Sequence, residues 1–146
     1  MYALAIEDGD LQISGGSYDV RTGAAKTEQD VTLALGEPLG NDRFHPGFGS
    51  QLYNFIGLPL TQAALFQVEQ EVARVVNNYA AVQYDQIQTD ALSGSPSRFT
   101  TSEIIGQVTQ IQVDGSLDTI LITISIQTVD EQDLILSTSI GGSGNA

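Results

Sequence analysis

The chain has 146 residues, and its 18 Asp and Glu against 5 Lys and Arg give a formal net charge of -13 at pH 7. This charge repels a phosphate backbone and excludes nucleic acid as the main partner. With no Cys and one His, disulfides, thiolate nucleophiles, Cys-based zinc sites and multi-His metal clusters are excluded as well. At this length we expect one compact domain over residues 1–140, followed by a flexible Gly-rich tail at 141–146.

No targeting or membrane segment is predicted at the start of the chain. Residues 1–8 contain neither a basic region nor a long apolar stretch. We therefore expect a protein that is made in a cytoplasm and stays soluble there. No cofactor or metal is expected either; calcium would be the best candidate for this acidic chain, but no Asp-rich loop has regular ligand spacing.

The first third of the chain predicts a β-hairpin and two short helices. Residues 2–20 alternate apolar runs with the turn formers Asp8-Gly9-Asp10 and Gly15-Gly16, which is typical of a hairpin. Thr27 and Asp30 have capping-box spacing, and the apolar residues after them predict a helix that ends at Gly36. Ser50 can cap a second short helix over residues 51–56, which Gly57 and Pro59 would end.

The clearest periodicity predicts a long amphipathic helix that begins at Thr61. Apolar residues recur three or four positions apart, namely Leu65, Val68, Val72, Val75, Val76 and Tyr79. Glu69 and Glu71 stand two positions apart, so they point in different directions, and we interpret them as a solvated face rather than a catalytic pair. This helix should supply one side of the core.

The second half of the chain predicts an antiparallel sheet. Ile120, Ile122, Ile124 and Ile126 alternate with more polar residues, which indicates one buried and one exposed face. We expect strands near 82–89, 104–114, 117–129 and 133–140, with turns at Asp114-Gly115 and at residues 130–133 and a mobile segment at 93–97. The fold class is therefore α+β, a small antiparallel sheet packed on one long amphipathic helix, with two short helices and an N-terminal β-hairpin.

The connection from Gly40 to Ser50 is unusual because it combines turn formers with two Phe and the only His. Arg43 can bind a carboxylate of a partner or fix carbonyls of its own loop. For His45 we favour a structural or interface role over a catalytic base, because no nucleophile has a recognisable context beside it. Phe44 and Phe48 can anchor a neighbour, but we favour burial in the core. Gly47 and Gly49 indicate a turn rather than a phosphate cradle.

This connection resembles the signature of a known family. Arg43, Pro46, Phe48, Gly49 and Ser50, with the predicted helices on either side, are similar to the contractile-tail baseplate wedge, or sheath-initiator, family of tailed phages, whose lysozyme-like members also occur in type VI secretion baseplates. The resemblance covers roughly residues 8–130. It departs from the family where Glu-Pro-Arg usually follows the long helix, since this chain has Tyr79-Ala80-Ala81 there. The resemblance therefore does not extend to the wedge contact made through that motif.

The resemblance implies a structural role in a virion rather than an enzymatic one. In that family the domain sits around the tail tube in the baseplate, and the sheath starts to polymerise on it. The implied partners are the tail sheath protein, the wedge and hub proteins and the tail tube, with several copies in a ring and with neither nucleic acid nor membrane. Assembly in the host cytoplasm and a final location in the tail baseplate would follow.

An exposed strand edge is the physical feature that such a role needs. A free edge supplies unpaired backbone donors and acceptors that a strand from another chain can complete. The short, Pro-free last strand is the candidate edge, and with three residues of the loop it gives the predicted interface: Arg43, His45, Phe48, Leu134, Leu136, Ser137, Thr138 and Ile140. We expect the acidic cluster Asp130, Glu131 and Asp133 to discourage premature pairing.

Two other functions stay open. A peptidoglycan-cleaving, lysozyme-like tail enzyme would need one carboxylic acid with a raised pKa in an apolar cleft and a second carboxylate across a sugar site. The acidic residues lie mainly in predicted turns and on polar helix faces, and the chain has no Trp, so we expect no enzyme. An equivalent scaffold in a related contractile injection system is the third possibility.

Overall fold

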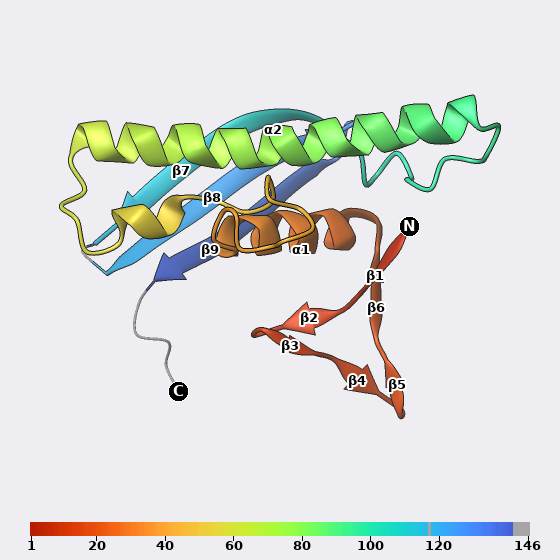
Figure 1. Ribbon diagram of the computed structural model, residues 1–146, viewed down its shortest axis with the longest axis horizontal. Helices are drawn as coiled ribbons and strands as arrows, with labels where there is room; N and C mark the ends of the chain where they lie inside the picture. The colour runs from red at the N-terminus through yellow and green to blue at the C-terminus, as the bar shows by residue number, and fades with distance from the viewer. Residues whose placement is uncertain (117, 142–146) are drawn as a thin grey trace.

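The computed structural model describes residues 1–116 and 118–141 and confirms the α+β class. A three-stranded antiparallel sheet lies beside two helices, and a group of very short strands precedes them (Figure 1). The helices are α1 (Gly23–Gly36), the 3-10 helix η1 (Leu52–Phe55) and α2 (Gln62–Leu92). The long strands are β7 (Ile105–Gly115), β8 (Thr119–Thr128) and β9 (Asp133–Gly141).

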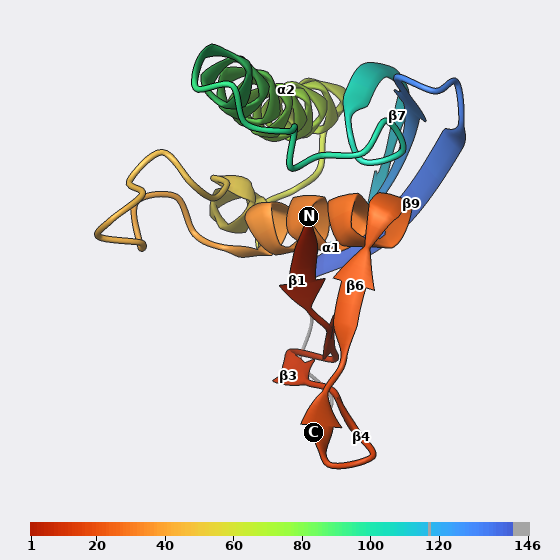
Figure 2. The same ribbon diagram turned by 90° about the vertical axis from the view of Figure 1, so that its right-hand side faces the viewer.

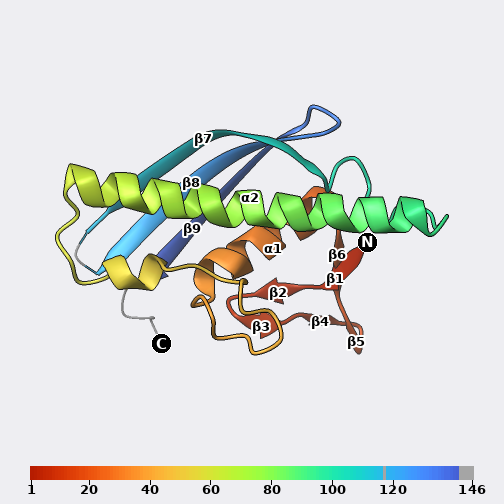
Figure 3. The ribbon, with the colours of Figure 1, turned by 45° about the horizontal axis from the view of Figure 1, so that its top comes forward.

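The sheet has the order β7-β8-β9, and one of its faces carries the core. The alternation predicted for the central strand is confirmed, because Ile120, Ile122, Ile124 and Ile126 are all fully buried. Helix α2 packs mainly on β7, while α1 packs on β9 and on α2 (Figures 1 and 3). Val31 and Leu35 of α1 join the core from one side and the Val residues of α2 from the other.

Helix α2 is much longer than the sequence pattern predicts, and the strand expected at 82–89 is part of it. The helical face continues through Gln83 and Asp90, which are 1 % and 3 % exposed. The Gln83 amide accepts from the N–H of Ile105 at 3.0 Å and donates to the C=O of Glu103 at 2.7 Å. These inward-facing positions are polar, so a search for apolar residues at helical spacing does not detect this part of the helix. The expected strand is wrong for that reason.

Helix α1 begins four residues before the expected cap. Thr27 does not cap it; the Thr27 hydroxyl is buried inside the helix and donates to the C=O of Glu103 at 2.7 Å. The first helical N–H, that of Gly23, instead donates to the carboxylate of Glu103 at 3.0 Å. A carboxylate at a helix N-terminus satisfies an otherwise unpaired donor and suits the helix dipole. The cap comes from a residue 80 positions away, so no local pattern could indicate it.

Three other predicted boundaries need adjustment. The helix expected at 51–56 is the 3-10 turn η1, and the Ser50 hydroxyl accepts from the N–H of Leu52 at 3.4 Å. Strand β7 continues through Gly115, so the turn to β8 starts at Ser116, whose N–H donates to the C=O of Thr119. Gly141 belongs to β9, and the predicted tail at 142–146 lies outside the described residues. The mobility expected at 93–97 stays a prediction.

The N-terminal segment is more elaborate than one hairpin. It forms three two-stranded ribbons: β1 (Tyr2–Leu4) pairs with β6 (Val20–Thr22), β2 (Ile6–Glu7) with β3 (Asp10–Leu11), and β4 (Ile13–Ser14) with β5 (Ser17–Tyr18). The ribbons occupy the corners of a triangle that extends from the body below α1 (Figures 1 and 2). We call residues 2–22 the three-ribbon unit.

Candidate functional site

Strand β9 is paired with β8 along one edge, and within the described residues no strand pairs with its other edge. The N–H of Thr128 donates to the C=O of Gln132 at 2.9 Å, which defines a hydrogen-bonded pair. Such pairs alternate along an antiparallel ladder, so the next one is Ile126 with Leu134. The backbone groups that point away from β8 therefore belong to the intervening residues Ile135, Ser137 and Ser139.

This alternation divides the predicted edge residues into two sets. Leu134, Leu136 and Ile140 are buried in the core, Thr138 is half-buried, and their backbone groups face β8. Of the predicted edge residues, Ser137 presents both its side chain and its N–H to the outside. Ile135 and Ser139, which the sequence analysis does not name, do the same. The register of the turn before β9 was the signal that could have identified them.

A groove of about 300 Å³ runs beside this edge. Ser137 lines it on one side, and the turn between β2 and β3 and one face of α1 line it on the others. Its charged residues are Glu7, Asp8 and Glu28 against Arg21, so the groove carries an excess of negative charge. Lys or Arg side chains on an extended segment that pairs with β9 would strengthen its binding beside this groove.

The opposite edge of the sheet, on β7, is irregular. Register shifts occur between Ile105 and Gln107 and between Val108 and Gln110, so Gly106 is left out of the ladder. Bulges of this kind twist an edge and hinder pairing with another chain. Helix α2 also packs along this strand. The two edges of one sheet therefore differ in their readiness to accept a partner strand.

The loop between α1 and η1 is closed at its base. The N–H of Leu39 donates to the C=O of Ser50 at 2.9 Å, and the N–H of Ser50 donates to the C=O of Glu37 at 2.7 Å. Gly49 lies inside this closure with a φ of 108°, and a Cβ there would stand 2.6 Å from the Glu37 carbonyl oxygen. No side chain fits at that position, so the predicted turn role of Gly49 is confirmed, whereas Gly47 has open space around it.

Helix α2 fastens the loop through an ion pair. Glu71 accepts from Arg74 at 2.7 Å and from the N–H of Gln51 at 2.8 Å, and Arg74 donates to the C=O of Gly49 at 3.0 Å. The hydrogen bond from Arg74 lowers the pKa of Glu71, and the bond from Gln51 adds to this effect. The interpretation of Glu71 as a solvated residue is therefore wrong, because the helix periodicity does not show the loop that folds over it.

The tip of the loop projects into solvent (Figure 2). Arg43 is exposed, and among residues 1–116 and 118–141 no hydrogen bond or ion pair involves its side chain; the loop carbonyl at Gly49 is bound by Arg74 instead. Phe44 is 89 % exposed and Phe48 is 37 % exposed, so the expected burial of both in the core is wrong. Aromatic residues next to helix ends usually enter the core, but the closed base of this loop holds its tip away from the core.

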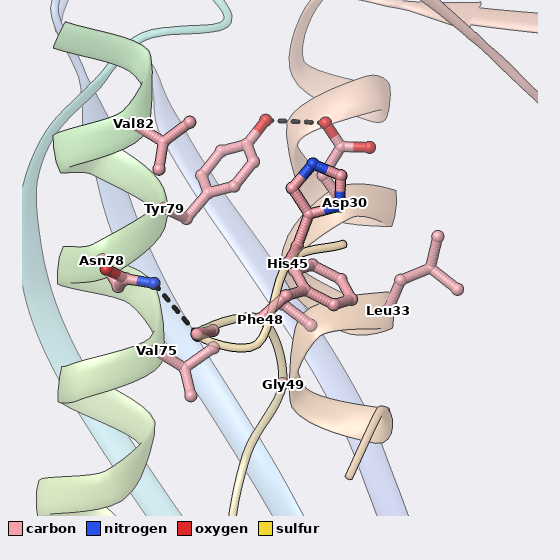
Figure 4. Close-up of a pocket in the computed structure, with 11 residues that line it drawn as sticks. Asp30, Leu33, His45, Phe48, Gly49, Val75, Asn78, Tyr79 and Val82 are labelled. Carbon is pink, nitrogen blue, oxygen red and sulfur yellow. Dashed lines mark hydrogen bonds between the residues drawn. The ribbon is translucent and has the colours of Figure 1, made fainter. Parts of the chain in front are cut away.

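His45 and Phe48 line a cavity of about 440 Å³ between α1, α2 and the loop (Figure 4). Its walls are mainly apolar, with Leu33 on α1 and Val75 and Val82 on α2. The Nδ1 of His45 lies 3.0 Å from a carboxylate oxygen of Asp42. The pKa of Asp42 is lowered, mainly by the N–H of Phe44 and then by His45. None of the described residues that line this cavity is a Ser, Thr or Cys, so His45 has no nucleophile to activate there.

The polar groups at one end of this cavity, on Asp30 and Tyr79, already have hydrogen-bond partners within the chain. The hydroxyl of Tyr79 donates to Asp30 at 2.7 Å (Figure 4). Lys26 binds the same carboxylate. Burial, and then the bond to Asp30, raise the pKa of Tyr79 far above its usual range. Tyr79 is therefore a neutral donor that ties α2 to α1.

The most buried carboxylates of the chain have structural partners. Glu103 is 1 % exposed and accepts from the N–H groups of Gly23 and Thr100 at 3.0 and 2.8 Å. Asp90 accepts from the side chain of Arg98 at 2.8 Å, and this bond lowers the pKa of Asp90. Neither residue lines the two cavities described above. Their carboxylates stabilise the junction between α2, α1 and β7.

Two further properties concern the part of the chain that the structure describes. No three Asp, Glu or His side chains in it are grouped closely enough to hold a metal ion. Nor does it contain a helix with the length and hydropathy that crossing a bilayer requires.

Comparisons with known proteins show a likeness in fold. The fold is similar to the crystal structure of a candidate tail lysozyme from Geobacter sulfurreducens, with a TM-score of 0.56 and 13 % sequence identity. The likeness covers 82 % of this chain and 91 % of that one. No protein-family model matches the sequence, and no curated protein matches it. At this identity the likeness establishes a shared fold and nothing finer.

Proposed function

We propose that this protein is a structural component of a contractile tail baseplate, where it starts sheath assembly by offering the free edge of β9 to a strand of the sheath protein. The observation that carries the proposal is the regular edge itself, with the outward N–H and C=O groups of Ile135, Ser137 and Ser139 beside an acidic groove. Such an edge is costly to leave unpaired in a mature protein, which favours a partner strand.

The comparison supports the same setting. The protein with the similar fold is described as a tail component, and the loop residues from Arg43 to Ser50 resemble the wedge family. Neighbouring wedge and hub proteins, the tail tube and further copies in a ring complete the proposed surroundings. Arg43, Phe44 and His45 protrude from the body, where they are available to such neighbours.

The proposal is tested by replacing Ser137 with Pro. Its N–H points away from β8, so Pro should leave the subunit folded while it removes the donor and obstructs an incoming strand. Ser137→Ala, which keeps the N–H, is the matched control. We expect sheath polymerisation on purified baseplates to fail with Pro and to proceed with Ala, as judged by electron microscopy. Sheaths of normal number and length with a folded Ser137→Pro protein would reject this edge as the site.

The name of the similar protein makes peptidoglycan cleavage the second candidate. The groove beside β9 is the place to test it, because Glu7, Asp8 and Glu28 all line this groove. Loss of turbidity of a cell-wall suspension with wild-type protein, abolished by Glu28→Gln, would favour an enzyme. We expect no loss of turbidity, since Glu7 and Asp8 are exposed and Glu28 is only half-buried, whereas the general acid of a glycosidase needs an apolar cleft.

A further inference from the structure

The three-ribbon unit is built around a ring of backbone hydrogen bonds. Three junction residues, Ala5, Gln12 and Asp19, connect the ribbons. The N–H of Ala5 donates to the C=O of Asp19, the N–H of Asp19 donates to the C=O of Gln12, and the N–H of Gln12 donates to the C=O of Ala5, at 2.8 to 2.9 Å. These junction residues are seven positions apart. Between them lie the turns Asp8-Gly9 and Gly15-Gly16, all four residues with positive φ, which matches two-residue hairpin turns. The unit is therefore a seven-residue repeat folded into a triangle (Figure 1).

The repeat gives the triangle two chemically different faces. Residues that pair directly across a ribbon share a face, and successive residues alternate between faces. The residues on either side of each junction residue therefore share one face, and Tyr2 lies on the same face. Six apolar or aromatic side chains of this face are 40 to 71 % exposed: Tyr2, Leu4, Leu11, Ile13, Tyr18 and Val20. The opposite face carries the pairs Glu7 with Asp10 and Ser14 with Ser17.

This face has no counterpart within the chain. Among residues 2–22, all of which the structure describes, Ala5 alone is buried. The unit leads into the start of α1, and Gln29 in the middle of that helix binds the backbone of Leu4 and Ile6 at 2.8 and 2.9 Å. Short two-stranded ribbons are marginal in water, and a contiguous apolar patch on a soluble protein usually marks an interface.

The charges of the unit indicate what covers this face. The turn residue Asp8 borders this face at the β2–β3 corner, Glu7 and Asp10 lie behind it on the opposite face, and the unit has four acidic residues against Arg21. A second copy would bring the same acidic excess to the contact, and the net charge of -13 on each chain adds to the repulsion. A surface that is apolar in its centre and basic at its margin would meet both properties.

We propose that the apolar face of the three-ribbon unit is a second docking site, distinct from the β9 edge, and that its occupant is a neighbouring tail protein with an apolar patch bordered by Lys or Arg. The partner's basic groups lie opposite the β2–β3 corner. That the partner is a tail protein rests on the proposed function. The apolar face and its acidic surroundings do not depend on that function.

The test compares tyrosine labelling of the free subunit with that of purified tails. Tyr2 and Tyr18 lie on the face, whereas Tyr53 and Tyr84 are exposed to similar degrees on η1 and α2. We expect all four to react with tetranitromethane in the free subunit, and Tyr2 and Tyr18 alone to lose most of their reactivity in the tail. Reactivity of Tyr2 and Tyr18 that is unchanged in the tail would overturn the inference.

A variant tests the same face by assembly. Ile13→Ser with Tyr18→Ser removes apolar groups from the ribbon farthest from the body, and Ser14→Ala with Ser17→Ala changes the opposite face of that ribbon as a matched control. Because two exposed apolar side chains are lost, we expect incorporation into tails to fall about tenfold or more, and no change in the control. Circular dichroism and thermal unfolding check that both variants fold.

The outcomes separate the two proposals. If wild-type protein is present in tails and the Ile13, Tyr18 variant is incorporated equally, the second docking site is rejected while the role of β9 stands. If wild-type protein is absent from tails, the proposed function fails and the tail partner with it. A dimer of the free subunit in light scattering that the Tyr18→Ser change abolishes would identify a second copy as the occupant and overturn the choice of partner.

Discussion

The two edge strands of the same three-stranded sheet differ in regularity and in how far they are covered. On β7 the ladder is interrupted twice and α2 packs along the strand, whereas β9 keeps an unbroken register with β8 from Gln127–Asp133 to Thr119–Gly141. Irregularity protects an edge from other chains, and regularity exposes it to them. The difference leaves β9 as the edge that is ready to pair, which is what the proposed function requires.

The largest expected effect comes from moving a Pro by one residue along β9. Thr138 lies in a hydrogen-bonded pair with Ile122, and Ser137 does not. We expect Thr138→Pro to lower the free energy of unfolding by about 3 kcal/mol, because the Ile122 carbonyl is left buried without a donor. Ser137→Pro should cost less than about 1 kcal/mol, since its N–H faces outward. Urea titration measures both; equal losses would show that the assigned alternation is wrong.

A smaller effect should distinguish the edges by added bulk. A Cβ on Gly106 of β7 would stand 3.0 Å from the carbonyl oxygen of Gln127. We expect Gly106→Val to reduce stability by about 1 to 3 kcal/mol through this overpacking. Ser139→Val on the exposed side of β9 is the matched change and should alter stability by about 0.5 kcal/mol or less. Thermal unfolding of the two variants gives the comparison.

The segment that leads into β7 is held by charge, so its stability should depend on pH. The Arg98 guanidinium lowers the pKa of Asp90 below its ordinary value of 3.8, and the N–H of Arg98 adds to this. The folded state binds that proton less tightly than the unfolded chain, so the stabilisation is complete above about pH 4 and is lost as pH falls through the lowered pKa.

We therefore expect Asp90→Asn to be less stable than wild type at pH 7, with a difference that shrinks as the pH falls below 3.8. Denaturant titrations at several pH values would follow this convergence. Asp85→Asn removes one negative charge from the exposed side of the same helix and serves as the control. A difference between wild type and Asp90→Asn that stays constant down to pH 2 would contradict the role of the ion pair.

The smallest expected effect concerns the acidic turn before β9. If Asp130, Glu131 and Asp133 discourage pairing of free subunits, their replacement by Asn, Gln and Asn should raise light scattering of the concentrated protein, most clearly at low salt. A control with the same loss of charge away from β9 changes Glu69, Asp85 and Asp114. Equal scattering from the two triple variants would assign the effect to net charge alone.

Much of the fold could be predicted from the sequence because its strongest patterns are local. The four buried Ile of β8 and the Val face of α2 follow directly from alternation and helical spacing. What failed depends on distant partners. Gln83 and Asp90 extend the helix with polar contacts to later segments, and Glu103 caps α1 from far along the chain. Residues 79–81, which the sequence places directly after the long helix, lie inside α2, and the chain leaves this helix at Ser93.

The sequence identified the strand that forms the candidate site, but not which of its backbone N–H and C=O groups point outward. Composition pointed to the last strand, yet the outward backbone groups depend on the register set at Thr128 and Gln132. The groove beside it needs the three-ribbon unit, α1 and β9 to meet, and no single stretch of sequence contains that arrangement. In the same way, exposure of Phe44 follows from the closed loop base at Ser50 rather than from the character of its neighbours.

The capping of α1 by Glu103 has a consequence for synthesis of the chain on the ribosome. When α1 has emerged from the exit tunnel, the carboxylate that receives its first N–H, and the carbonyl that receives the Thr27 hydroxyl, have not been translated. Closing so long a loop is entropically costly, so the helix should become fully ordered late, together with the β7 end of the sheet. The N-terminal ribbons, which hang from that helix, would then be among the last parts to reach their final position.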